Sequence, residues 1–217
     1  MNLGLPGKNS EIRILPVFPL PDTVFFPGTT LPLNVFESRY KDMIRDVTAG
    51  SGLIVVSLQA GDGFQELGTM GRVHDLEALE DGRFKIQLMG LERMFLAEVP
   101  VDTSYRQVRV EARPEQTGTN DASVITKARL ELLASYGMLR SMVRKNEPLV
   151  LQQDLPFELC VNMACASLPV DASLQQQLLR EDTLIGRQRL GLELFSTAIE
   201  MLSWLRAMKG SGWSLKN

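Results

Sequence analysis

The chain has 217 residues, of which 44% are hydrophobic and 23% are charged, and its formal net charge at pH 7 is −3. These proportions are typical of a globular protein that is long enough to bury a core without disulfides. The acidic balance gives no support for binding to nucleic acid or to an anionic membrane, because phosphate recognition requires a concentrated basic face. No leader peptide opens the sequence and no apolar run reaches the length of a membrane span. We therefore expect a cytoplasmic protein.

The first structural signal is the stretch PVFPLPDTVFFPG at residues 16–28, in which four prolines alternate with apolar residues. Proline removes a backbone hydrogen-bond donor and fixes φ, so neither a helix nor a long central strand is expected here. The stretch predicts short edge strands joined by a tight turn. Its aromatic residues are too apolar for a solvated loop, and they have two interpretations: they close the core, or they contact a protein partner.

Residues up to about 113 are predicted to form mainly strands. Strand-like patterns occupy residues 53–58, 68–79, 83–89, 94–99 and 105–112, with a hairpin turn at Asp81-Gly82. Gly90 predicts a bulge or a close turn between two of them. One helix interrupts this half, because Tyr40, Met43, Ile44 and Val47 recur at helical spacing before Gly50.

The polar segment at residues 114–121 is the best candidate for a linker, and the pattern beyond it is helical. Helices are predicted at 123–143, at 156–168, from the N-cap Asp171 through Leu179, and at 182–208. The expected buried side of the last helix consists of Leu184, Ile185, Leu190, Leu194, Ile199, Leu202 and Leu205. The predicted fold class is α+β. The predicted parts are a flexible N-terminus at 1–11, a β-barrel domain at 12–116, a helical subdomain at 117–209 and a flexible tail at 210–217.

A search for catalytic groups finds few. The chain has one histidine, His74, and its two cysteines, Cys160 and Cys165, are expected to be reduced, buried thiols. This set cannot form a standard zinc site, and neither GLPGK at 4–8 nor GTMG at 68–71 has the spacing of a nucleotide-binding loop. We therefore predict no catalytic residue, no metal site and no cofactor. Three methionines, Met70, Met89 and Met94, belong either to the core or to a surface that binds varied hydrophobic segments.

Four blocks in the same order then suggest a family. Residues 15–35 (LPVFPLPDTVFFPGTTLPLNV) resemble the start of the substrate-binding N-terminal domain of ATP-dependent Lon proteases. The blocks FESRY at 36–40, ELGTMGRV at 66–73, and DGRF at 81–84 with GLER at 90–93 are similar to further motifs of that domain. In the helical half, Leu168-Pro169-Val170 followed by residues 176–179 also resembles the family pattern. The resemblance covers about residues 12–206.

The resemblance implies a PUA-like pseudo-barrel packed against a helical bundle. It also implies a part in selecting unfolded or tagged protein substrates and in oligomer assembly. The sequence contains neither the P-loop ATPase module nor the Ser–Lys protease domain of Lon, so those activities are not carried over. A zinc domain found in some relatives has no counterpart here.

The main hypothesis is therefore a non-enzymatic module that recognises unfolded or extended protein segments, or a Lon-type ATPase protease. The candidate protein-binding residues are Phe18, Phe25, Phe26, Phe36 and Arg39. One alternative is RNA binding by the PUA-like barrel, with Arg106, Arg109 and Arg113 as the basic positions to test. A second alternative is an uncharacterised small-molecule enzyme. No membrane partner is expected, and the sequence leaves the oligomeric state open.

Overall fold

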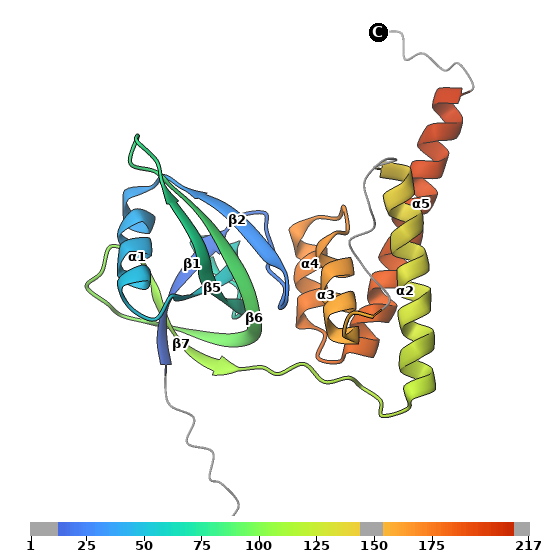
Figure 1. Ribbon diagram of the computed structural model, residues 1–217, viewed down its shortest axis with the longest axis horizontal. Coiled ribbons are helices and arrows are strands. Elements are labelled where there is room, and N and C mark those ends of the chain that lie inside the picture. Colours follow the sequence, from blue (N-terminus) through green and yellow to red (C-terminus); the bar gives the residue numbers. More distant parts are fainter. Residues whose placement is uncertain (1–12, 144–153, 211–217) are drawn as a thin grey trace, which may run out of the picture.

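The computed structural model describes residues 13–143 and 154–210 (Figure 1). The flexible N-terminus predicted for residues 1–11, and all but the first residue of the tail predicted for 210–217, lie outside the described residues. The described part consists of a sheet of mostly antiparallel strands followed by helices. The predicted α+β fold class is confirmed, with one helix inside the β half.

The first half contains seven strands and one helix. They are β1 (Arg13–Leu20), β2 (Thr30–Val35), α1 (Ser38–Ala49), β3 (Leu53–Ala60), β4 (Gly63–Phe64), β5 (Leu67–Ala78), β6 (Phe84–Val99) and β7 (Gln107–Ala112). The hydrogen-bonded order β1-β7-β6-β5-β3 returns to β1, because β1 also pairs in parallel with β3. Five strands thus form a closed ring, to which β2 adds on β6 and β4 adds on β3.

Strand β1 closes this ring by changing its partner halfway along. Residues 13–16 pair with β7, whereas residues 17–20 pair with β3. The prediction of short edge strands was wrong in this respect, since β1 is an eight-residue strand that completes the barrel. Its prolines are tolerated because each half of the strand has a ladder partner on one side only. Because the single N–H of a residue points to one side of its strand, proline fits at positions 16 and 19 where that side has no ladder partner.

Strand β6 also differs from its prediction. Instead of two strands separated at Gly90, one strand runs from Phe84 to Val99. The register with β5 shifts between Met70 and Gly71, which leaves Leu91 as an extra residue and confirms the predicted bulge. Gly90 is required there because a Cβ at this position would collide with the carbonyl oxygen of Phe26. A second shift makes His74 the extra residue on β5.

Helix α1 covers one side of the barrel, as its amphipathic pattern predicts. Its four predicted core residues are all buried. Alternate residues of β3 enter different clusters: Ile54 and Val56 pack with α1, and Val55 packs with β1, β5, β6 and β7 on the other side. This two-sided burial explains the continuous apolar run of β3.

The second half consists of four helices. They are α2 (Ala122–Val143), α3 (Phe157–Ala166), α4 (Ala172–Arg180) and α5 (Leu184–Gly210). The predicted N-cap is confirmed, because the Asp171 carboxylate accepts a hydrogen bond from the Leu174 amide at 3.0 Å. Helices α2 and α5 lie side by side and run in the same direction (Figure 1). None of the described helices is long and apolar enough to cross a membrane.

Two residues expected on the buried side of α5, Leu190 and Leu205, are exposed. Near the barrel, Leu184 and Ile185 are buried as predicted. The same face also buries Arg187, Gln188 and Phe195, and the two polar side chains among them are not detected by a hydrophobic pattern. Leu205 lies in the last part of α5, which extends away from α3 and α4 (Figure 1).

The barrel and the helices share one hydrophobic cluster. Barrel residues Val24, Phe26, Leu58 and Leu67 pack with the buried faces of all four helices. In addition, the Gln176 side chain on α4 donates to the Leu67 carbonyl at 2.9 Å. The two halves are therefore packed together along a continuous interface.

Candidate protein-binding surface

The structure separates the five predicted binding residues into two groups. Phe18, Phe25 and Phe26 are buried, whereas Phe36 and Arg39 are exposed. The three buried phenylalanines belong to the core, which is one of the two interpretations that the sequence left open. Whether Phe36 and Arg39 contact a partner stays a prediction.

Phe25 and Phe26 are neighbours in the chain but enter different cores. Phe25 packs in the cluster beneath α1, and Phe26 packs in the cluster shared with the helices. Thr69 of β5 fixes this segment, because its hydroxyl donates to the Phe25 carbonyl at 2.5 Å. The apolar stretch that opens the sequence therefore joins the barrel core to the helical core.

Arg39 and Phe36 flank the start of α1. The Arg39 Nε donates to the Glu37 carboxylate at 3.0 Å, and its guanidinium carbon lies 4.5 Å from the centre of the Tyr40 ring. The Phe36 side chain is 65% exposed, directly before the helix. The ion pair between Arg39 and Glu37 therefore lies at the start of α1.

An apolar surface lies on the outer side of β2 and β6. We call it the β2–β6 face and define it by Pro32, Met89 and Leu91. Met89 and Leu91 are each 38% exposed, and Pro32 is exposed on the neighbouring strand. Of the three methionines named from the sequence, Met70 and Met94 are buried. The sequence did not predict that Leu91 is exposed. The feature that could have indicated it is the bulge predicted at Gly90, in which Leu91 is the extra residue.

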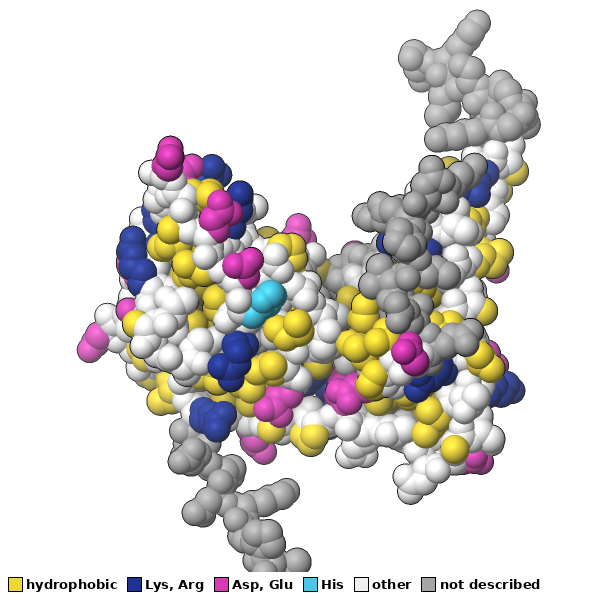
Figure 2. Space-filling model, viewed as in Figure 1, with side chains coloured by type: hydrophobic (Ala, Val, Ile, Leu, Met, Phe, Trp, Pro, Cys, Tyr) yellow, Lys and Arg dark blue, Asp and Glu magenta, His cyan; other side chains and the backbone are white. Residues whose placement is uncertain are grey.

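Beside this face, β2 has an open edge. Within the described residues β2 pairs only with β6, and its pattern alternates between exposed and half-buried positions. Except at Pro32, which has no N–H, this unpaired edge offers N–H and C=O groups to an added strand. Figure 2 shows hydrophobic side chains on both sides of the indentation where the barrel meets the helices.

A second apolar surface lies near the C-terminal end of α5. Met201, Trp204 and Leu205 are exposed at the i, i+3, i+4 spacing of one helix face, and the Trp204 side chain is 61% exposed. This surface was not predicted, because Leu205 was assigned to the buried side.

The most concentrated charges are buried and structural. Arg93 of β6 and Arg187 of α5 have no exposed side-chain surface. Arg187 is hydrogen-bonded to the Glu115 carboxylate and to the Asn162 amide oxygen. Arg93 donates to the carbonyls of Leu179 and Glu181 at 2.8 and 3.0 Å. These groups join the barrel, the linker and three helices.

Electrostatics agree with a structural role for this cluster. Burial lowers the pKa of Arg93, and the neighbouring Arg187 charge acts in the same direction. Glu115, Asp182 and the carbonyls at the end of α4 compensate the two cations, since a helix C-terminus carries partial negative charge. At the rim, the Arg113 guanidinium lowers the pKa of the Asp182 carboxyl.

Two of the three basic positions named for RNA binding are paired with carboxylates. Arg113 donates to Asp182 at 2.9 Å, and Arg106 lies 3.5 Å from Glu98. Arg109 is exposed on β7. Among the described residues, no group of three or more histidine, cysteine or acidic side chains is arranged to hold a metal ion. Cys160 and Cys165 form no disulfide, and both are buried.

Comparisons with known proteins were consistent with the fold. Residues 14–196 match the model of the ATP-dependent protease La (LON) substrate-binding domain. A Lon protease from Anaeromyxobacter dehalogenans is 29% identical over 219 residues, and Lon protease 2 from Myxococcus xanthus is 26% identical over 214 residues. These matches cover 91% and 92% of this chain but only 25% of each relative. The chain thus spans about a quarter of the length of these relatives.

Two solved structures share the fold. The N-terminal domain of the Mycobacterium avium complex Lon protease superposes with a TM-score of 0.66 at 17% identity, covering 85% of this chain and 98% of that domain. A Lon N-terminal domain protein from Xanthomonas campestris gives 0.61 at 23% identity, covering 89% and 99%. Since the family model matches most of the chain and the structures share its architecture, this protein belongs to the LON substrate-binding domain family.

Proposed function

We propose that this protein is a non-enzymatic recognition module that binds unfolded or extended protein segments on the β2–β6 face. The family is described as a substrate-binding domain, and this supports a role in recognising proteins. The observation that carries the proposal is the combination of an exposed apolar face at Met89 and Leu91 with the open edge of β2. Two buried cysteines that form no disulfide are in keeping with a cytoplasmic location.

The chemistry of the face fits an extended apolar segment. A bound strand on β2 would satisfy its free backbone groups, and alternate side chains of the segment would lie beside Pro32, next to the surface formed by Met89 and Leu91. Methionine is unbranched and flexible, so it accommodates side chains of different shapes. This combination favours recognition of hydrophobicity and extension rather than of one sequence.

The experiment measures binding of a fluorescent, reduced and carboxymethylated lactalbumin, which stays unfolded, by fluorescence anisotropy. The double variant Met89→Ser/Leu91→Ser is compared with Leu130→Ser/Leu190→Ser, which changes two exposed leucines on the helical half. Loss of two partly buried apolar contacts should weaken binding about 10-fold or more in the first variant. The second variant should bind like the wild type. No binding by the wild type, or equal binding by both variants, contradicts the proposal.

Strand addition is tested with a short apolar peptide and the same peptide methylated at alternate backbone amides. Methylation removes the donors on one edge while leaving the side chains in place. If the bound segment extends the sheet, only the unmodified peptide should bind. If both bind equally, the side chains alone are recognised and strand addition on β2 is wrong. Selection of Lon substrates and contact with a Lon-type ATPase are the cellular roles that we propose for this binding.

A further inference from the structure

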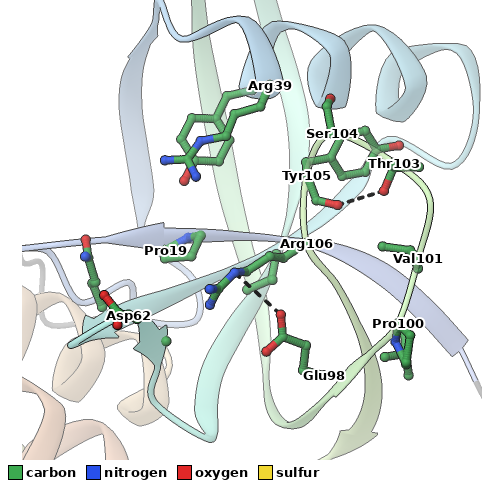
Figure 3. A pocket seen from close by; sticks show the side chains of 15 residues that line it. Pro19, Arg39, Asp62, Glu98, Pro100, Val101, Thr103, Ser104, Tyr105 and Arg106 are labelled. Atoms are coloured by element: carbon green, nitrogen blue, oxygen red, sulfur yellow. Dashed lines mark hydrogen bonds and ion pairs between the residues drawn. The ribbon is translucent and has the colours of Figure 1, made fainter.

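A cavity of about 410 Å³ opens in the barrel near the point where β1 leaves β7 and joins β3. Figure 3 shows that its walls come from β1, from the turn after β3, from the connection between β6 and β7, and from the start of α1. It lies apart from the β2–β6 face, since it shares no lining residue with it. Cavities of this size accept a small ligand or a few amino-acid residues.

Three hydrogen-bond donors in this cavity lack full partners. Arg106 faces Glu98 through its Nε at 3.5 Å, while its two terminal nitrogens donate to no described residue. Arg39 bonds Glu37 through Nε and Nη2, which leaves Nη1 without an acceptor among the described residues. The Tyr40 side chain also lines the cavity, and its hydroxyl, which has no hydrogen-bond partner in the described part of the chain, is open to solvent.

These three donors lie within electrostatic reach of one another. Burial raises the pKa of the Tyr40 phenol, whereas the positive charges of Arg39 and Arg106 act in the opposite direction. Figure 3 shows Arg39 and Arg106 on either side of Pro19. Because Pro19 has no N–H, the backbone at this point cannot donate to an added strand, and recognition falls to the side chains.

The charges of the wall restrict the ligand. Asp62 and Glu98 also line the cavity and Glu37 pairs with Arg39, so three carboxylates accompany the two guanidinium groups. A phosphate dianion carries up to twice the charge of a carboxylate, so these acidic side chains would repel it more strongly. A single carboxylate instead matches the planar guanidinium and accepts from it in a bidentate manner.

We propose that this cavity binds a carboxylate group, with the terminal nitrogens of Arg106, Nη1 of Arg39 and the Tyr40 hydroxyl as donors. The carboxylate can belong to the end of a polypeptide chain, to an acidic side chain or to a free small acid. The proposal does not depend on the proposed function, because the two sites use different residues and are tested with different variants.

The experiment follows the backbone amide resonances of the ¹⁵N-labelled protein during titration with three peptide probes, and separately with acetate and with inorganic phosphate. The probes are acetyl-Ala-Leu-Ala with a free carboxylate, the same peptide as its amide, and acetyl-Ala-Glu-Ala amide. The free acid should shift resonances of residues 98–106 and 39–40, and the Ala-Leu-Ala amide should not. Binding of the acetyl-Ala-Glu-Ala amide would identify side-chain carboxylates as a source. Equal shifts with acetate alone would identify a free small acid.

Variants then assign the donors. Arg106→Gln should weaken binding of the free acid about 10-fold, and Tyr40→Phe, which removes only a hydroxyl, should weaken it about 3-fold or more. Arg109→Gln is the matched control, since Arg109 is an exposed arginine of the next strand that does not line the cavity. Three results would overturn the proposal: equal binding of the Ala-Leu-Ala acid and amide, tighter binding of inorganic phosphate, or no shift with any carboxylate probe.

Discussion

Arg93 on β6 and Arg187 on α5, which are 94 positions apart in the chain, donate hydrogen bonds to the same carbonyl oxygen, that of Glu181, at 3.0 and 2.9 Å. Both also donate to the Leu179 carbonyl. The last carbonyls of α4 lack partners within the helix, and here they are satisfied by one arginine from each half of the molecule. The relative placement of barrel and helices is therefore fixed by hydrogen bonds as well as by apolar packing.

The first prediction concerns this contact. Arg93→Met should lower the free energy of unfolding by about 2–3 kcal/mol, because it removes the buried hydrogen bonds from Arg93 to the Leu179 and Glu181 carbonyls and leaves these groups to Arg187 alone. Urea unfolding followed by circular dichroism measures the change. Arg113→Ala is the control, since its pair with Asp182 is partly exposed and should contribute little. An equal effect of both substitutions would contradict the role given to Arg93.

The second prediction concerns the close approach of β6 to the segment before β2. Gly90→Ala should lower the free energy of unfolding by about 1–3 kcal/mol, because the added Cβ would collide with the Phe26 backbone. Gly63→Ala is the matched control, since a Cβ there would meet the Ala60 carbonyl at an ordinary 3.6 Å. Thermal unfolding of the two variants measures the difference, and a neutral Gly90→Ala would show that the bulge relaxes.

The third prediction concerns alkaline pH. Burial and a hydrogen bond to Asp46 at 2.7 Å raise the pKa of Tyr105 to about 12, above the usual value of about 10. The folded state thus holds this proton more tightly than the unfolded state. Its contribution to stability is complete below pH 10 and is lost as the pH rises toward 12. The urea midpoint of Tyr105→Phe should fall less steeply over this range than that of the wild type, while the two curves run parallel below pH 10.

The fourth prediction concerns the thiols. Burial raises the pKa of Cys165 to about 12, so the reactive thiolate is nearly absent in the native protein. In the Cys160→Ser variant, Cys165 should react with Ellman's reagent at pH 8 at least ~100-fold more slowly than in urea, because reaction requires opening of the core. Rapid labelling of the folded variant would show that Cys165 is accessible.

Much of the fold could be predicted from the sequence. The four core residues of α1, the Asp171 N-cap and the change from strands to helices follow from periodicity and capping rules, which depend on local sequence. The family resemblance predicted how the two halves are arranged. The PUA-like assignment and the domain boundaries at residues 116 and 117 stay predictions.

The features that could not be predicted depend on contacts between distant segments. Arginine is usually exposed, so a pattern gives no reason to bury Arg93 and Arg187, which are compensated by carbonyls at the end of a remote helix. For the same reason the polar part of the buried face of α5 was missed, and Leu190 was assigned to it. The change of β1 from β7 to β3 occurs because the strands close into a ring. It depends on several strands together and cannot be predicted from the sequence of β1 alone.

The shared capping of α4 also has a consequence for the order of events during synthesis. The ribosome releases Arg93 long before Leu179 and Glu181, which follow it by 86 and 88 residues. Until α4 emerges, the nascent barrel carries a guanidinium at the site of its future helical interface, where solvent can still hydrate it. Arrival of α4 replaces that water with carbonyls, so docking of the helices is the step that commits the barrel to its final, dehydrated state.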